Sequence, residues 1–373
     1  MSSVVIKLGS SVVAADDGRV RSDVLARICD DVAALRTAGY DPIVVTSGAI
    51  ARGLGVMGLP AARPQPPAQG QRRRAVDELQ AASAIGQGKL YRVYDELLQE
   101  RGVPSAQVLL TFFDMSARTH YLNVRHTLAK LLEWRVVPVI NENDTTTTDE
   151  ISFGDNDFLA AQVAILVDAE RLLLLTNTDG VFTADPRTDP DARPVRRIEH
   201  VEQLEVLQIT QATSALGSGG MRSKVVAAEM ATAAGIPTVI AGGLVPGSIT
   251  AAVAGEPVGT AFAAREGRYS SFKLWLKYAK PARGRVLVDE GAARALREGG
   301  TSLLPVGVID VTGSFEAGDA VDIEGTAGPV GKGISNLSSA ELRQVRGMKS
   351  EHVRRLLPAA SDEAIHRDYL VLA

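Results

Sequence analysis

Cysteine and long apolar runs are both scarce in this sequence. Cys29 is the single cysteine among 373 residues, which excludes an intramolecular disulfide and a zinc site built from several cysteines. No apolar run approaches the roughly 20 residues of a membrane-spanning helix. The N-terminus also lacks a basic segment before its apolar residues, so a signal peptide is not indicated. We therefore expect a cytoplasmic protein without membrane contact.

An excess of positive charge is missing as well. The chain has 40 Lys and Arg residues against 44 Asp and Glu residues, which gives a net charge of −4. Such a protein has no global positive field to attract nucleic acid or an anionic membrane. Any anionic ligand must therefore be bound by a local group of residues.

Motifs of several common enzyme classes are absent. The sequence holds no G-x-x-x-x-G-K-[ST] segment, and its first candidate strand runs into Lys7-Leu-Gly-Ser-Ser rather than G-x-G-x-x-G. These absences disfavour a P-loop nucleotidase and a Rossmann dehydrogenase. Ser47 lacks the first glycine of a G-x-S-x-G turn, and none of the five histidines lies in a recognisable triad. A serine hydrolase is therefore disfavoured too.

What is present is an alternation of short apolar strands with segments of helical length. The candidate strands are 4–6, 43–45, 108–110, 136–140, 172–175 and 238–240. Helices are expected at 75–98, at 158–167 and between Ser22, a candidate N-cap, and Gly39. This alternation predicts an α/β fold with a parallel sheet covered on both faces. Ligands then bind at the carboxyl ends of the strands.

The length of the chain predicts more than one domain. We expect an α/β domain at 1–264, a basic connector at 265–281 and a small β-barrel at 282–373, with strands at 285–288, 302–311, 320–323 and 329–331. The proline-rich segment 58–74 is expected to be an exposed loop.

The candidate strands end in small, polar, glycine-rich segments. Taken singly, such a turn is more often structural than functional, because glycine tolerates a positive φ. Together they converge on one rim of the sheet, where backbone N–H groups and helix N-termini can bind phosphate. Lys7 ends a buried type of strand and Lys224 begins a candidate helix. These lysines would supply the positive charge that phosphoryl transfer needs.

Carboxylates are concentrated between 144 and 157. Asp155, Asn156 and Asp157 follow Gly154 and could simply form a turn and a helix cap. Asp144, Asp149 and Glu150 lie just upstream, and so many negative charges repel one another unless a cation balances them. A metal ion or a substrate that carries an ammonium group would do so.

These segments together resemble the glutamate 5-kinase family. The resemblance extends in order through nearly the whole chain and is carried by Val5-Ile-Lys-Leu-Gly-Ser-Ser, Val45-Thr-Ser-Gly-Ala-Ile, Val137-Pro-Val-Ile-Asn-Glu-Asn-Asp, Phe153-Gly-Asp-Asn-Asp, Gly219-Gly-Met-Arg-Ser-Lys, Val288-Asp-Glu-Gly-Ala and Ser302-Leu-Leu-Pro. It implies an amino-acid-kinase-type parallel-sheet sandwich followed by a PUA-like β-barrel. It also implies phosphorylation of the γ-carboxylate of L-glutamate with ATP and Mg²⁺, the first step of proline biosynthesis. Inhibition by proline and a homo-oligomeric state are further expectations.

The resemblance also implies roles for individual residues. Ser47, Asp144 and Asn156 would hold glutamate. Lys7, Asp155 and Lys224 would be catalytic, with Asp155 organising the lysines and the metal, whose ligands are not assigned. The implied ATP-binding residues are Lys7, Thr176, Asn177, Ser218, Gly219, Gly220, Met221, Arg222, Ser223 and Lys224. Two of these depart from the family pattern, since Asn177 replaces a usual aspartate and Ser218 a usual threonine.

The chemistry agrees with the missing histidine motifs. A glutamate side chain has a pKa near 4.3 and is already ionised at neutral pH, so its attack on phosphorus needs no general base. The obstacle is repulsion between carboxylate and triphosphate, which lysines, backbone amides and Mg²⁺ reduce.

Two other hypotheses stay open at this point. One is an amino-acid kinase that acts on acetylglutamate, aspartate or carbamate. The other is an RNA-binding protein, because PUA domains often bind RNA. Residues 282–373 hold eleven Lys and Arg against thirteen Asp and Glu, which makes nucleic acid an unfavoured partner.

Overall fold

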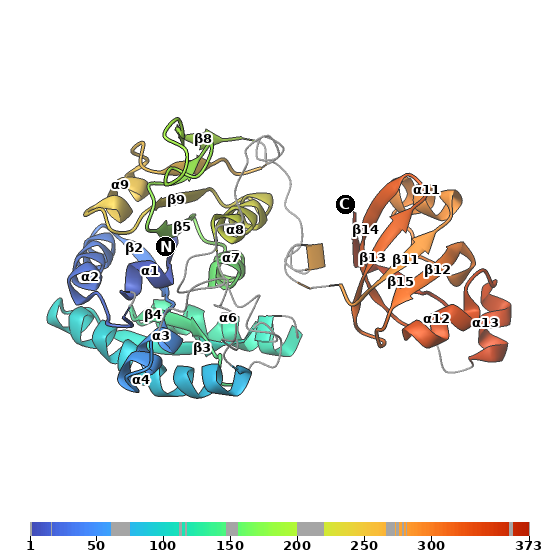
Figure 1. Ribbon diagram of the computed structural model, residues 1–373, viewed down its shortest axis with the longest axis horizontal. Helices are drawn as coiled ribbons and strands as arrows, with labels where there is room; N and C mark the ends of the chain where they lie inside the picture. Colours follow the sequence, from blue (N-terminus) through green and yellow to red (C-terminus); the bar gives the residue numbers. More distant parts are fainter. Residues whose placement is uncertain are drawn as a thin grey trace. The chain divides into compact units, whose positions relative to one another are not determined.

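The protein consists of two compact units, Met1–Arg268 and Tyr269–Ala373 (Figure 1). Its computed structural model describes residues 2–15, 17–60, 75–111, 114–115, 118–146, 156–199, 220–265, 273, 276–277, 280, 282–357 and 361–372. Each unit has its own main sheet. The finer boundaries expected at 264, 265–281 and 282 stay a prediction.

An eight-stranded sheet forms the centre of the first unit, in the order β3-β4-β2-β1-β5-β9-β10-β8. Its strands are β1 (Ser2–Leu8), β2 (Tyr40–Val45), β3 (Ser105–Leu110), β4 (Val137–Glu142), β5 (Arg171–Thr176), β8 (Arg197–Ile198), β9 (Thr238–Gly242) and β10 (Thr260–Phe262). The six strands from β3 to β9 in that order run parallel, whereas β10 is antiparallel to β9. The predicted parallel-sheet α/β fold is confirmed.

Helices cover both faces of this sheet (Figure 1). They are α1 (Ser10–Val13), α2 (Ser22–Thr37), α3 (Ala49–Val56), α4 (Val76–Glu100), α6 (Arg118–Glu133), α7 (Asn156–Leu166), α8 (Met221–Ala233) and α9 (Ser248–Ala254). Side chains alternate across a strand, so Val4, Ile6 and Leu8 of β1 pack with α2, α4 and α9 in one core. Lys7, between them, points to the opposite face, where α7 and α8 pack on the strands.

The backbones of helices α3 and α4 lie close together where the helices cross, because a glycine of each helix lies at the crossing. A Cβ at Gly53 would lie 1.8 Å from the carbonyl oxygen of Ala82, and one at Gly86 would lie 1.9 Å from that of Ala49. No larger residue fits there without moving a backbone. The crossing therefore fixes α4 closely against α3, which begins directly after the end of β2.

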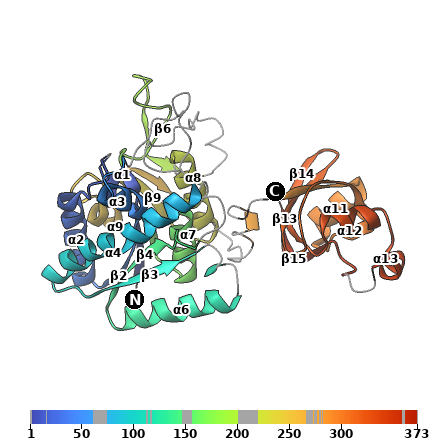
Figure 2. The ribbon, with the colours of Figure 1, turned by 60° about the horizontal axis from the view of Figure 1, so that its bottom comes forward.

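Two details of the first unit differ from expectation. Arg21, not Ser22, is the N-cap of α2, and Ser22 is the first residue of the helix with no side-chain cap. A small sheet also forms between β6 (Val181–Phe182) and β7 (Pro194–Val195). It stands away from the helices that cover the main sheet (Figure 2). The expected loop at 58–74 falls mostly on residues 61–74, outside the described residues.

The second unit is built on a five-stranded sheet in the order β12-β11-β13-β14-β15. Its elements are β11 (Gly284–Val288), α11 (Glu290–Gly299), the 3₁₀ turn η2 (Pro305–Gly307), β12 (Val308–Gly313), β13 (Ala320–Gly325), β14 (Gly328–Ser335), α12 (Ser339–Val345), α13 (Ser350–Leu356) and β15 (Ile365–Leu372). The strand expected at 302–311 is wrong in its first half, because Pro305 begins η2. A proline fixes φ and lacks an N–H group, so it interrupts a strand.

Hydrophobic packing and caps stabilise this second unit. Its core includes Val286, Leu296, Ile323 and Leu342, all nearly inaccessible to solvent. Asp289 caps α11 by accepting a hydrogen bond from the Ala292 amide, and Ser338 forms a capping box with Glu341 on α12. In the part of the chain that the structure describes, no helix is both long and apolar enough to cross a membrane.

Candidate functional site

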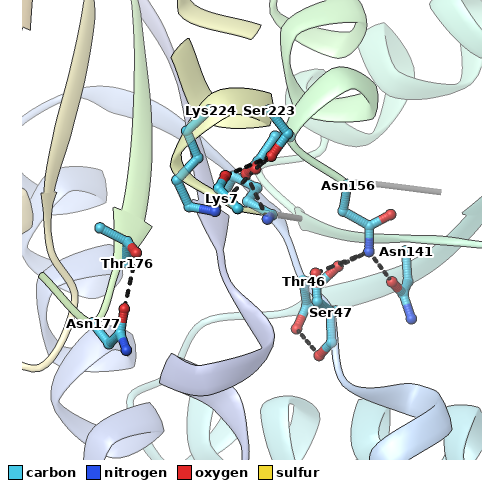
Figure 3. Close-up of polar contacts among 11 residues, drawn as sticks. Lys7, Thr46, Ser47, Asn141, Asn156, Thr176, Asn177, Ser223 and Lys224 are labelled. Atoms are coloured by element: carbon cyan, nitrogen blue, oxygen red, sulfur yellow. Dashed lines mark hydrogen bonds and ion pairs between the residues drawn. The ribbon is translucent and has the colours of Figure 1, made fainter. Parts of the chain in front are cut away.

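The candidate site residues lie in a row along the carboxyl ends of four neighbouring strands. The order β4-β2-β1-β5 places Asn141 on β4, Ser47 just after β2, Lys7 on β1 and Thr176 at the end of β5. Figure 3 shows the same sequence of groups, with Lys7 between Thr176 on one side and Ser47 on the other. The sheet thus divides the site into a centre and two flanks.

At the centre, two lysines share one buried carboxylate. Lys7 Nζ lies 2.5 Å from Asp157 Oδ1, and Lys224 Nζ lies 3.0 Å from Asp157 Oδ2. Ser223 Oγ also donates to Asp157 Oδ2, at 3.0 Å. Asp157 is fully buried, and Lys7 and Lys224 are 2% and 5% exposed. Burial alone would raise the pKa of Asp157, but the charges of Lys224 and Lys7 hold it well below its usual range.

Asp157, which the structure places between the two lysines, was not among the site residues expected from the sequence. The role of organising the lysines was assigned to Asp155, which lies outside the described residues. Asp157 is the second residue of α7, and this helix packs against β1 and α8. The sequence offers two acidic residues two positions apart, and the choice between them depends on where the helix begins. Helix boundaries are the least reliable part of a sequence-based prediction.

The first turn of α8 carries Ser223 and Lys224. Gly220 is its N-cap and supplies no side-chain cap. Ser223 Oγ lies 2.8 Å from the Gly220 carbonyl oxygen. A cation such as Lys224 is unfavourable near a helix N-terminus, and Asp157 offsets that cost. Met221 is partly buried and Arg222 is exposed, whereas Ser218 and Gly219 lie outside the described residues.

On the flank toward β2 and β4, Asn156 joins three segments. Its Nδ2 donates to the Thr46 carbonyl oxygen at 2.6 Å and to Asn141 Oδ1 at 2.8 Å, and it lies 3.1 Å from Ser47 Oγ. Gly48 follows with a φ of 100°, which lets the chain turn from β2 into α3. Asn156 and Ser47, both predicted substrate residues, are therefore neighbours (Figure 3).

Asp144 lies in the same part of the chain, two residues after β4. It is held by Ser83 of α4, whose Oγ donates to Asp144 Oδ2 at 3.1 Å. Burial raises the pKa of Asp144 to about 6, although the Ser83 hydrogen bond acts in the opposite direction. Because burial makes the ionised form of Asp144 unfavourable, a cation that binds beside it would stabilise that form.

On the opposite flank, Thr176 ends β5 and Asn177 follows it. Thr176 is 6% exposed, and its Oγ1 donates to Asn177 Oδ1 at 3.3 Å. Asn177 is exposed. Nearby, the Gly9 amide donates to the Leu175 carbonyl oxygen, and a Cβ on Gly9 would lie 3.2 Å from that oxygen. The side chains of Thr176 and Asn177 therefore offer uncharged polar groups at the end of β5.

A metal centre made only of protein side chains is not seen in the described part of the chain. Among the residues that the structure describes, no group of three or more His, Cys, Asp or Glu side chains could hold a metal ion. Asp157 is engaged by both lysines. Residues 147–155, with Asp149, Glu150 and Asp155, lie outside the described part.

Two domain families and full-length relatives match the chain. Residues 2–242 match the model "Amino acid kinase family" and residues 284–357 match the PUA domain. A glutamate 5-kinase from Meiothermus ruber is 42% identical over 99% of this chain and 95% of its own length. Glutamate 5-kinases from Synechococcus sp. (strain JA-3-3Ab) and Burkholderia vietnamiensis are also 42% identical over 99% of this chain, and over 98% and 97% of their own lengths.

Proposed function

Since the chain belongs to the glutamate 5-kinases of the amino acid kinase family, we propose that the strand-end row centred on Lys7, Asp157 and Lys224 is its active site. The reaction is the ATP-dependent phosphorylation of the γ-carboxylate of L-glutamate to L-glutamyl 5-phosphate, the first step of proline biosynthesis. The observation that carries the assignment is that two buried ammonium groups share one carboxylate. This group lies between the polar end of β5 on one side and, on the other side, the amide side chains of Asn141 and Asn156 near the ends of β2 and β4.

The centre supplies the electrostatic part of the reaction. A lysine ammonium has three N–H donors, and Lys224 gives one of them to Asp157. Its other donors would contact phosphate oxygens of the substrate. In a buried site a fixed positive charge stabilises the transferring phosphoryl group far more than it would in water. Asp157 fixes the direction of both lysines, because each of its carboxylate oxygens contacts one of them.

The two flanks divide the substrates. ATP is assigned to Thr176, Asn177 and the first turn of α8, and glutamate to Ser47, Asp144 and Asn156. The glutamate γ-carboxylate is then the nucleophile, already ionised, and the phosphoryl group passes across β1. Asp144 is the group that would pair with the α-ammonium of glutamate, which favours free glutamate over acetylglutamate because acetylation removes that charge.

Mg²⁺ is the expected companion of ATP. It binds mainly through phosphate oxygens, water and one or two carboxylates, so it would enter with the nucleotide. The described side chains do not complete a site for it alone. Feedback inhibition by proline, a homo-oligomeric state and a cytoplasmic location also remain proposals.

A coupled assay tests the proposed function. The protein should release ADP from ATP in the presence of L-glutamate, and much more slowly with aspartate, acetylglutamate or no acceptor. Adding hydroxylamine should trap the acyl phosphate as γ-glutamyl hydroxamate. ADP release that is the same with and without glutamate would refute the assignment, and an RNA-binding role would then regain support.

The raised pKa of Asp144 predicts a pH dependence. Only the ionised carboxylate attracts an ammonium group, so kcat/KM for glutamate should fall about tenfold per pH unit below pH 6 and level off above it. Bound glutamate favours the ionised form, so binding should release a proton near pH 6. Initial rates between pH 5 and 8, at fixed ionic strength, measure the profile.

Asp144→Asn is the matched control, because it keeps the shape and removes the titration. Its kcat/KM for glutamate should be about 30- to 1000-fold lower than that of the wild type at pH 8, as expected for the loss of a charge-assisted hydrogen bond. Its profile should be flat near pH 6. A wild-type profile without an inflection, or one that the variant shares, would contradict this role of Asp144.

A further inference from the structure

Helix α4 supports the glutamate flank through two side chains that the proposed mechanism does not use. Gln87 and Tyr94 are seven residues apart on α4, which places them on one face of the helix. The α3–α4 crossing at Gly53 and Gly86 fixes this helix beside the end of β2. Both side chains contact groups that in turn hold Asn156.

Tyr94 acts on the turn that follows β2. Its hydroxyl lies 2.7 Å from Thr46 Oγ1, and both residues are almost fully buried. Thr46 Oγ1 donates its own proton to the Ser47 carbonyl oxygen at 3.2 Å. The Tyr94 hydroxyl is therefore the donor to Thr46, and the two bonds in series orient the segment that carries Ser47.

The Thr46 carbonyl oxygen determines the direction of the Asn156 amide. A backbone carbonyl only accepts hydrogen bonds, so the group 2.6 Å away must be the amide nitrogen, Nδ2. Asn156 Oδ1 then points away from Thr46 and Asn141 (Figure 3). It is buried and has no hydrogen-bond partner among the described residues. A buried acceptor without a partner is costly, and a donor from a ligand would remove the cost.

Gln87 reinforces the same direction from the other side. Asn141 Oδ1 accepts from Asn156, so the nitrogen end of Asn141 faces away from it and donates to Gln87 Oε1 at 2.6 Å. Gln87, Asn141 and Asn156 thus form a chain of amides with one polarity. Turning any one of them would bring two N–H groups or two oxygens together.

We propose that Tyr94 and Gln87 are positioning residues of the glutamate subsite. They hold the Asn156 amide so that its Oδ1 accepts a hydrogen bond from the α-ammonium group of the substrate. This inference rests on the proposed function. It adds the requirement that the phosphorylated substrate carries a hydrogen-bond donor, its ammonium group, opposite Asn156 Oδ1.

Two variants that keep side-chain size test the proposal. Tyr94→Phe removes only the hydroxyl, and Gln87→Met removes the amide, including the oxygen that accepts from Asn141. Each should raise the KM for glutamate about 5- to 30-fold while the KM for ATP stays within about twofold. Gln87→Glu keeps an acceptor oxygen and should restore the KM for glutamate to within about threefold of the wild type.

Tyr91→Phe is the matched control. Tyr91 lies on the same helix, but its hydroxyl contacts Asp95 and Ser105, the first residue of β3, and not the carboxyl ends of the strands. This variant should leave both KM values unchanged. If it raises the KM for glutamate as much as Tyr94→Phe does, the effect belongs to the helix as a whole and the proposal fails.

Glutarate, which is glutamate without the ammonium group, separates positioning from general damage. As a competitive inhibitor it should have the same Ki, within about twofold, in the wild type and in Tyr94→Phe, because it never makes the bond to Asn156 Oδ1. An equal loss of glutarate and glutamate affinity overturns the inference. An unchanged KM for glutamate with a lowered Tm also overturns it, since Tyr94 would then serve stability alone.

A variant that does not fold, a failure of the proposed function and a failure of this inference give different results. If Tyr94→Phe does not fold, Thr46→Val removes the same hydrogen bond from the other partner and must give the same shift in the KM for glutamate. If the wild type itself transfers nothing to glutamate, the proposed function fails. If the wild type is active and both Tyr94→Phe and Gln87→Met leave the KM for glutamate unchanged, only the present inference fails.

Discussion

Replacing Asp157 by asparagine should cost both catalysis and stability. The variant leaves Lys7 and Lys224 buried without the carboxylate that they share. Removing one partner from a buried ion pair typically costs about 3–5 kcal/mol of unfolding free energy. The lysines would also lose their fixed direction, so kcat should fall by about 10²- to 10³-fold.

Urea denaturation and initial rates on one preparation measure both effects. Rates should be taken well below the Tm of the variant, so that unfolding does not imitate a loss of turnover. Asp23→Asn is a suitable control, because Asp23 is 81% exposed and its contact with Arg27 is long; exposed pairs contribute little. A stable Asp157→Asn enzyme with near-normal kcat would remove Asp157 from the site.

Removing either lysine should affect catalysis without the same loss of stability. The wild-type group has two positive charges and one negative charge, so Lys7→Met and Lys224→Met each leave one lysine paired with one carboxylate. The phosphoryl group, however, loses one of its two positive neighbours, and kcat should fall about 10²- to 10³-fold. The decrease in unfolding free energy should be clearly smaller than for Asp157→Asn.

Turnover and urea midpoints of the two lysine variants can be compared directly with those of Asp157→Asn. Lys89→Met, at an exposed position of α4, is the control for loss of a lysine as such. Two results would count against the scheme. One is near-wild-type kcat in a lysine variant, which would exclude that lysine from transfer. The other is equal destabilisation by all three changes.

The amino-acid sequence was sufficient for the fold and for the members of the site that lie on strands. Apolar runs of strand length and the turns after them are local features, so the sequence alone places Lys7, Ser47 and Thr176 on one rim of the sheet. Two local details were not predicted, namely the 3₁₀ turn that begins at Pro305 and the N-cap at Arg21 in place of Ser22. Both depend on backbone dihedral angles, and the same short sequence can adopt more than one set of these angles.

The partners of these residues could not be predicted in the same way. Whether Asp155 or Asp157 faces the lysines depends on the start of α7. The contacts of Tyr94 with Thr46 and of Gln87 with Asn141 join residues 48 and 54 positions apart. Such contacts arise from the packing of α4 against the strand ends, and Tyr94 reads in the sequence as an ordinary core residue of an amphipathic helix.

The order of the strands has a consequence for how such an enzyme can change over evolutionary time. β1 lies between β2 and β5, so the residues assigned to the acceptor and those assigned to the donor belong to different neighbours of one strand. Mutations in β2, β4 or α4 can remodel recognition of the acceptor without altering β5. Specificity for the molecule that is phosphorylated can thus drift while use of the same phosphoryl donor persists. Lys7 lies on the shared strand β1, so a substitution there would affect the binding of both substrates. We therefore expect Lys7 to change less readily than the residues on either flank.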